Sequence, residues 1–551
     1  MTSAKLILAF ALTAAAAQAL AAAPPKLSEA QARHLLGRVG FAPTQTEVDR
    51  LTGQSASKAV SSLIAQAQAA NPQFSAPEFV AGPPPVAYRL LNTQEEKQAQ
   101  RQQQLREGLE MKTWWMREMI TSPTPLKERM TLFWHNHFAT SQQKVNRSQA
   151  MWRQQQVLRA DALGSFRTLL HNVAKDPAML IYLDGANSRK EAPNENFARE
   201  VMELFTLGEA THGGNYTEQD IKEAARAFTG WSVDQGDLAF KFRPAFHDDM
   251  PKTILRSTGN FDGDQALDIL LDQPAAAHFV VGKLWREFVS PTPDEAQVAR
   301  IAARFKASDY SIAAALNDVL MTDAFWAPAN RGSLVKSPVD LVVGTVRQFN
   351  FAYTDALPFA LKTAQLGQNL LVPPNVKGWP GQNDWITATT LLERKRFTEQ
   401  LFRAVERKGD ASVPRVAMQT SGKVTDDMVG PPKNDLGNMG MGLGETMRPG
   451  QKLQAEFAGG TPGAGGTLQA LRLLGPGGVN RMANGMSQIT FEPGPWLASY
   501  GGYTDRVPTE DVRNRLEQVL LPVPPTQTIP SGTVGVAYLR NLTLDPAYQL
   551  K

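Results

Sequence analysis

The sequence contains no cysteine, which excludes disulfide bonds, thiolate metal ligands and thiol nucleophiles. It also has no concentrated basic block, because 57 Lys and Arg residues are spread among 53 Asp and Glu residues. Nucleic-acid binding usually needs a basic patch, so this even spread argues against it. Phosphate-binding glycine loops, dinucleotide fingerprints and the nucleophile elbow of serine hydrolases are missing too. The 551 residues must therefore rely on a hydrophobic core for their stability.

Long apolar runs are also missing, so we expect no transmembrane segment in the mature chain. The N-terminus, "MTSAKLILAFALTAAAAQALAAAPPK", has Lys5, an apolar run over residues 6–17 and the small-residue triplets "AQA" and "ALA". This order is typical of a secretory signal peptide, here residues 1–21, cleaved after Ala19 or Ala21. The alternative is an uncleaved anchor helix, for which the run is short. We expect export to the periplasm, or secretion out of the cell.

Strand signals are scarce, whereas helix signals are abundant. Capping boxes begin at Ser28, Thr44 and Thr217, each with an acidic or amide residue three positions later. Between such caps, apolar residues recur at spacings of three and four, which indicates helices with one buried face. Residues 93–120 have the pattern of one long helix that is polar in its first half. We therefore predict a mainly α fold with a large multi-helix body over residues 26–408.

A few segments depart from the helical pattern. Residues 230–242, "GWSVDQGDLAFKF", predict a small β-hairpin around the turn "DQGD", and residues 532–539 are a weaker strand candidate. Residues 409–466 are rich in Gly, Pro and Met, which indicates a loose insertion or linker. Helical pattern resumes in residues 467–551, which we expect to pack back on the body.

The stretch "NENFAREVMELFTLG" (194–208) carries two carboxylates that the helical period places on one face, Glu200 and Glu203. Arg199 lies four residues before Glu203 and is in position to pair with it. Two carboxylates one turn apart are able to bind a divalent cation or to share a proton. The alternative is a solvated helix face with a single ion pair.

The next helical pattern, "YTEQDIKEAARAFTGW" (216–231), is joined to the first by a short loop, so we expect an antiparallel helix pair. Arg226 is expected to hold Glu223, one turn back, rather than a substrate. The hairpin then leads into "FHDD", where His247 and Asp248 are of the residue types that bind metals. The alternative is a turn in which an aspartate bonds its own backbone.

Two of the seven histidines stand in "FWHNHF" (133–138). On a helix His135 and His137 point about 200° apart, so they cannot enter one pocket together. His137 is the better candidate for a metal ligand, and the alternative for either is a buried core histidine bonded to backbone.

A dense aromatic loop, "PPNVKGWPGQNDW" (373–385), is rich in Pro and Gly. Trp379 and Trp385 either seal the core or form a stacking platform for a sugar or peptide ligand. The sealing role is favoured, because turn-rich aromatic loops commonly pack inward.

Together with "LLGRVGFAPT", "HDDMPKTIL" and the final "LDPAYQLK", these stretches occur in an order that resembles the bacterial domain-of-unknown-function 1800 family. The resemblance implies an exported, mainly helical protein without an established activity or accepted catalytic residues. It also implies a partner, the exported family of unknown function 1501, which is often encoded next to it. The chain departs from the family pattern at Val201, where leucine is usual, and at residues 249–251, beside the predicted metal loop.

Two functions follow as hypotheses. In the first, the motifs converge on a pocket that binds a divalent metal through His137, His247 and Asp248 and activates water for hydrolysis. Glu200 or Glu203 would then be the base, and Arg226 would stabilise an anion. In the second, the chain is a non-catalytic binding or assembly protein of the cell envelope. A third interpretation makes the polar residues a buried ion network that only shapes the core.

Overall fold

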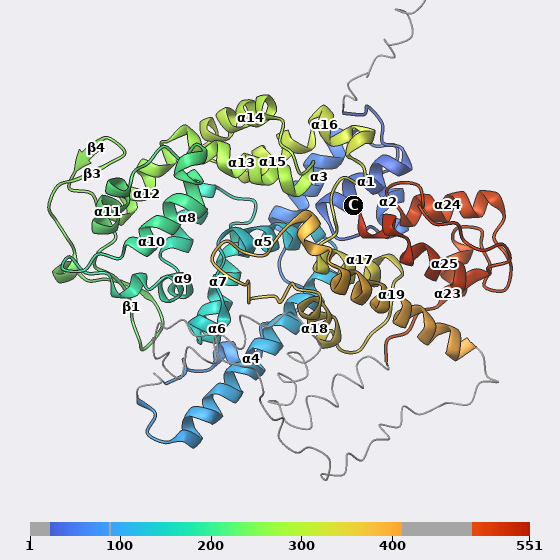
Figure 1. Ribbon diagram of the computed structural model, residues 1–551, viewed down its shortest axis with the longest axis horizontal. Helices are drawn as coiled ribbons and strands as arrows, with labels where there is room; N and C mark the ends of the chain where they lie inside the picture. The colour runs from blue at the N-terminus through green and yellow to red at the C-terminus, as the bar shows by residue number, and fades with distance from the viewer. Residues whose placement is uncertain (1–22, 87–89, 410–487) are drawn as a thin grey trace, which may run out of the picture.

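A computed structural model describes residues 23–86, 90–409 and 488–551 (Figure 1). The predicted signal peptide and the predicted Gly/Pro/Met-rich insertion lie outside these residues, except for Gly409, at which a helix ends. The described chain is built from helices, with two small antiparallel hairpins. This confirms the prediction of a mainly α fold with a small hairpin. Within the described part, no helix is long and apolar enough to cross a membrane.

The N-terminal helices begin where the caps predicted them. The side chains of Ser28 and Thr44 each accept a bond from the backbone N–H three residues on, and the side chain at that third position bonds back. Satisfying the free N–H groups at a helix start in this way stabilises it by about 1 kcal/mol. These helices are α1 (Glu29–Val39), α2 (Gln45–Leu51) and α3 (Ala56–Ala69), followed by the long α4 (Gln94–Thr121).

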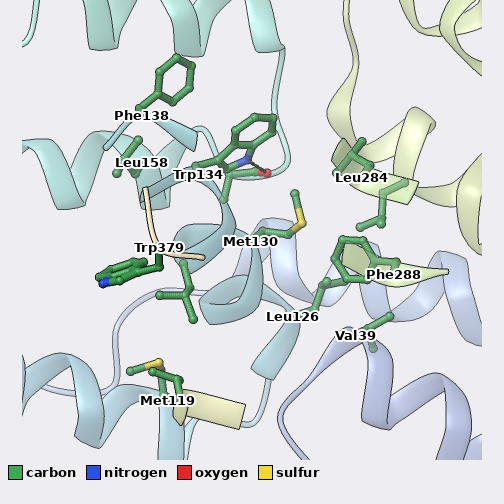
Figure 2. Packing of buried hydrophobic residues seen from close by; sticks show 14 of the residues in the cluster. Val39, Met119, Leu126, Met130, Trp134, Phe138, Leu158, Leu284, Phe288 and Trp379 are labelled. Carbon is green, nitrogen blue, oxygen red and sulfur yellow. Dashed lines mark hydrogen bonds between the residues drawn. The ribbon is translucent and has the colours of Figure 1, made fainter. Parts of the chain in front are cut away.

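Helix α5 (Pro125–His137) lies at the centre of the molecule (Figure 1) and carries all of the "FWHNHF" motif except Phe138, which caps its end. Figure 2 shows Leu126, Met130 and Trp134 of this helix among the buried side chains of the core. The Trp134 indole is fully buried and donates to the carbonyl oxygen of Ala162 at 2.9 Å. A buried indole needs such an acceptor, so this bond fixes the orientation of α5 as well as filling space.

A second group of helices surrounds α5 and reaches the hairpins. Helices α13 and α14 pack side by side, as do α10 and α11. The group comprises α6 (Gln142–Val145), α7 (Ser148–Ala160), α8 (Phe166–Ala174), α9 (Pro177–Tyr182), α10 (Glu195–Glu200), α11 (Glu218–Ala227), α12 (Gly263–Leu271), α13 (Pro274–Phe288), α14 (Glu295–Ala307), α15 (Ile312–Leu320) and α16 (Asp323–Trp326). Short one-turn helices lie in the connecting segments: η1 (Glu78–Ala81) between α3 and α4, η3 (Gly185–Asn187), η5 (Ala210–His212) and η6 (Pro244–Phe246) within this group, and η7 (Pro328–Asn330) after α16.

The predicted hairpin is formed by β1 (Trp231–Val233) and β2 (Phe240–Phe242), with Trp231 opposite Phe242. A second hairpin, β3 (Lys252–Ile254) with β4 (Ser257–Gly259), follows directly and was not predicted. Its strands are three residues long, too short for an alternating pattern to be visible in the sequence. Strand β3 packs against α11.

Of the C-terminal part predicted to pack back on the body, residues 467–487 lie outside the described residues, and the rest does so, with α25 against α19. The remaining elements are α17 (Pro338–Gln348), α18 (Leu357–Gln365), η8 (Gln382–Trp385), α19 (Ala388–Gly409), α23 (Pro493–Ala498), α24 (Glu510–Leu520), α25 (Gly535–Leu544) and η9 (Pro546–Gln549). The strand expected at residues 532–539 is wrong, because most of it lies in α25. Tyr538, Leu539 and Leu542 form the buried face of that helix, which packs against α19.

Candidate functional site

The predicted helix of residues 194–208 changes its winding halfway. Asn194 caps α10 by accepting from the N–H of Phe197 at 3.2 Å. After Glu200 the chain continues as a π-helix, η4 (Val201–Leu207), in which the hydroxyl of Thr206 donates to the carbonyl of Val201 at 2.7 Å. A π-helix is rare, and such segments occur frequently at functional sites. The carboxylate pair predicted from the sequence stands at this junction.

Glu200 and Glu203 are both half-buried, and neither carboxylate makes a hydrogen bond or ion pair with another described residue. Burial raises the pKa of Glu200, and the negative charge of Glu203 raises it further, against the opposing charges of Lys377 and Arg199. The two carboxylates are therefore close enough to influence each other. We call Glu200 and Glu203 the carboxylate pair.

The sequence places Arg199 in position to pair with Glu203, but the structure gives its guanidinium another partner. Its guanidinium donates instead to both carboxylate oxygens of Glu218 on α11, at 2.7 and 2.6 Å. A fork-to-fork contact of this kind is geometrically better than a pairing along one helix. This pairing links α10 to α11, and among the described residues Glu203 has no cation within ion-pair distance.

Two tyrosines border the carboxylate pair. Burial, with the charge of Glu200 adding to it, raises the pKa of Tyr182, and burial together with Glu203 raises the pKa of Tyr216 to about 12. Tyr216 is only 7% exposed, and its hydroxyl lies near the backbone of Ala210 without a hydrogen-bond partner of acceptable geometry. A buried hydroxyl without a partner is unfavourable, so it marks a position where an acceptor or a donor is missing.

His137 lies behind the π-helix, where both ring nitrogens are engaged. Nε2 donates to the carbonyl oxygen of Phe205 at 3.0 Å, so Nδ1 is free to accept from the Lys283 amine at 3.0 Å. Burial and the neighbouring lysine hold the pKa of His137 well below its usual range. Burial, helped by Arg286, lowers the pKa of Lys283 to about 7. His137 is thus a neutral core histidine that supports the π-helix, and neither nitrogen is available to a metal in this arrangement.

The other motif histidine, His135, is also buried, and burial lowers its pKa to about 4. Its ring lies between Trp115 and Trp379 at centroid distances of 5.6 and 5.4 Å. Between the two histidines, Asn136 accepts a bond from the backbone N–H of Trp379 at 2.7 Å. The motif therefore anchors the aromatic loop of residues 373–385.

Trp379 and Trp385 are 5% and 6% exposed. Stacking on a sugar or peptide requires an open ring face, which these buried rings do not offer, whereas sealing of the core agrees with their burial. The same loop carries Lys377, whose amine lies 3.6 Å from a carboxylate oxygen of Glu209 and whose charge reaches Glu200. The loop thus contributes a cation, rather than an aromatic platform, to the surroundings of the carboxylate pair.

Arg226 lies in a separate cluster on α11. It donates to Glu223 at 2.8 Å, as predicted, and binds Asp248 through Nε at 2.7 Å and through a terminal nitrogen at 3.2 Å. Hydrogen bonding to Arg226 lowers the pKa of Asp248. His247 uses Nδ1 to donate to the carbonyl oxygen of Thr229 at 2.9 Å. We call Arg226, Asp248 and Glu223 the arginine clasp, which fastens the loop after β2 to α11.

The predicted residues therefore fall into two groups. No hydrogen bond or ion pair among the described residues joins the carboxylate pair to Arg226, His247 or Asp248. In the same part of the chain, no group of three or more His, Asp or Glu side chains is arranged to hold a metal ion. The metal site therefore remains a prediction, because the described residues do not bring together enough side chains to hold a metal ion.

Sequence reasoning missed Tyr182, Tyr216, Lys283 and Lys377. Lys283 had a usable signal, since it interrupts the apolar residues of "FVVGKLW" (279–285) with a single charge. The roles of the others depend on which distant segments lie beside α10, and no local spacing reveals that.

Comparison with known proteins gives one family. The model described as "Protein of unknown function (DUF1800)" matches residues 34–490. No curated protein and no solved structure matches the chain.

Proposed function

The chain belongs to the DUF1800 family, and we propose that this member is a binding protein that receives a lysine or arginine side chain of a partner at the carboxylate pair. On the strength of the predicted signal peptide, we place it in the bacterial cell envelope. The exported family 1501 protein expected from the family resemblance is the proposed partner.

The observation that carries the proposal is the unpaired state of the carboxylate pair among paired neighbours. Glu209, Glu218 and Glu223 each have a cation within 4 Å. Within the described part of the chain, Glu200 and Glu203 have none, although burial already makes the charge of Glu200 unfavourable. An added cation would relieve both the burial penalty and the mutual repulsion of the two carboxylates.

The surroundings suit an ammonium or guanidinium group. Carboxylates accept charge-assisted hydrogen bonds from such groups, and tyrosine faces attract cations. The Tyr182 ring already has the Lys144 amine 5.5 Å from its centroid. The Tyr216 hydroxyl supplies a further polar atom without a partner.

A second candidate function is acid–base chemistry at the same pair, which the raised pKa of Glu200 favours. In this case Glu200 would carry a proton and Glu203 would act as the base in hydrolysis. The metal-assisted form of this chemistry needs ligands beyond the arginine clasp, because both oxygens of Asp248 are bound by Arg226.

Calorimetric titration of the mature protein with tetralysine tests the first candidate. A matched peptide with all amines acetylated controls for backbone contacts. We expect binding of tetralysine that weakens with added salt, since exposed ion pairs are screened, and no binding of the acetylated peptide. Equal affinity for both peptides, or no binding of either, would reject the proposal.

A further inference from the structure

A second cluster of charged side chains lies where the end of the chain meets α17 and α19, near the mark C in Figure 1. Four cations, Arg129, Lys336, Arg394 and Lys551, surround Asp340. Backbone bonds between Lys336 and Gln549 (2.7 Å) and between Lys551 and Leu334 (2.8 Å) fix the chain end in this position. The cluster shares no residue with the carboxylate pair or the arginine clasp.

The two carboxylates of this cluster, Asp340 and Glu287, are both in contact with Arg129 and Lys551. Asp340 accepts from Arg129 through one oxygen and from Lys551 at 2.8 Å through the other, and the N–H of Ser337 adds a bond at 3.0 Å. Glu287 lies 3.2 Å from Arg129 and 3.7 Å from Lys551. These contacts hold the pKa of Asp340 well below its usual range despite burial.

Among the described residues, no carboxylate lies within ion-pair distance of Lys336 or Arg394. Arg394 is fully buried and donates only to neutral acceptors, the Gln549 side-chain oxygen at 3.2 Å and the Lys336 carbonyl at 2.9 Å. The amine of Lys336 lies over the Tyr548 ring, 4.0 Å from its centroid. Burial lowers the pKa of Lys336 to about 7. The charge of Asp340 opposes this shift, and the positive charges of Arg394 and Lys551 add to it. Two buried positive groups therefore feel the charge of Asp340 only at a distance and share it with Arg129 and Lys551, which contact it directly.

The unsatisfied hydrogen-bonding atoms here are all donors. Nε of Arg394 and Nε2 of Gln549 are buried and have no hydrogen-bond partner in the part of the chain that the structure describes. The two side chains are bonded to each other and lie beside Lys336. Buried donors almost always find an acceptor, so a cluster of unpaired donors with excess positive charge indicates a missing negative acceptor.

We infer that Lys336, Arg394 and Gln549 form a binding site for a small inorganic anion. The anion would accept from Arg394 Nε and Gln549 Nε2 and neutralise the charge of Lys336. It would thereby stabilise the attachment of the chain end to α17 and α19. A water molecule would satisfy the donors without supplying charge, and the test separates the two.

The test measures thermal unfolding of the full mature chain while chloride, bromide or phosphate replaces gluconate at constant ionic strength. An anion that binds only to the folded state should raise Tm by about 2 °C when its concentration is about ten times its Kd. Lys336→Met should abolish this shift, whereas Lys58→Met, which removes an exposed lysine, should retain it. No anion-dependent shift in the unmodified protein, or an equal shift in Lys336→Met, would overturn the inference.

Crystals soaked in bromide give a readout that does not depend on the variant folding. An anomalous peak within hydrogen-bonding distance of Arg394 Nε and Gln549 Nε2 is expected. Electron density there without an anomalous signal would identify water and refute the anion.

Discussion

The side-chain oxygen of Asn136 accepts a hydrogen bond from the backbone N–H of Trp379 at 2.7 Å. This bond joins two motifs that lie far apart in the sequence, and it brings the loop that carries Lys377 beside the π-helix. Gly378 makes the approach possible, because its φ is +90° and a Cβ there would lie 2.3 Å from the Asn136 side-chain oxygen and 2.5 Å from its backbone oxygen. Any residue larger than glycine at position 378 would therefore clash with Asn136.

Gly378→Ala should lower the free energy of unfolding by about 2 kcal/mol or more, since it combines a strained backbone with a backbone clash. Urea denaturation followed by tryptophan fluorescence measures the change. Gly381→Ala in the same loop is the matched control, because a Cβ there meets nothing within 4 Å and its φ is −126°. Equal losses in the two variants would contradict the described packing.

Asp248→Asn should destabilise the protein by about 1–2 kcal/mol, because it weakens two charge-assisted bonds to Arg226 in the arginine clasp. Chemical denaturation measures the loss, and Asp249→Asn, which removes a neighbouring charge, is the control. The same preparations titrated with zinc and manganese test the metal prediction. Stoichiometric binding that Asp248→Asn abolishes would show that Asp248 is a ligand and would overturn the clasp as its main role.

Glu200→Gln should have a pH-dependent effect whose sign follows from the raised pKa of Glu200. The folded state binds this proton more readily than the unfolded chain, so wild-type stability falls as the pH rises from 4.5 through the folded value. Glutamine removes that penalty. We expect the variant to gain stability relative to wild type at neutral pH and to lose the gain below the unfolded value. Glu195→Gln, an exposed change on the same helix, should not reproduce this profile.

Lys283→Met tests the support behind the π-helix. The folded pKa of Lys283, about 7, lies below its ordinary value of 10.5, so between these values the unfolded chain binds more protons. Wild-type stability should therefore rise with pH across this window, by up to about 1 kcal/mol per pH unit from this group. Denaturation at several pH values should show a smaller slope in Lys283→Met, and Lys222→Met, at an exposed site, should keep the wild-type slope.

Local features of the sequence predicted the fold well, because caps and helical periodicity act over a few residues. The capping box of Thr217 and the hairpin turn "DQGD" both formed where expected. The π-helix was missed because it spans only the seven residues Val201–Leu207. Over so short a segment, the wider turn of a π-helix shifts the apolar spacing too little to be distinguished from that of an α-helix. The partner of Arg199 was missed because Glu218 becomes its neighbour only when α10 and α11 pack together. For the same reason, convergence of the motifs on one site could not be judged from spacing alone.

The central claim is that the carboxylate pair binds a cationic side chain. The most direct test measures the affinity for tetralysine of two double variants. The first, Glu200→Gln with Glu203→Gln, neutralises the carboxylate pair. The control, Glu510→Gln with Asp511→Asn, removes the same charge from exposed positions on α24. Loss of two ion pairs predicts binding about tenfold weaker in the first variant and close to wild type in the second. Wild-type affinity in the first variant, or an equal loss in both, would contradict the account.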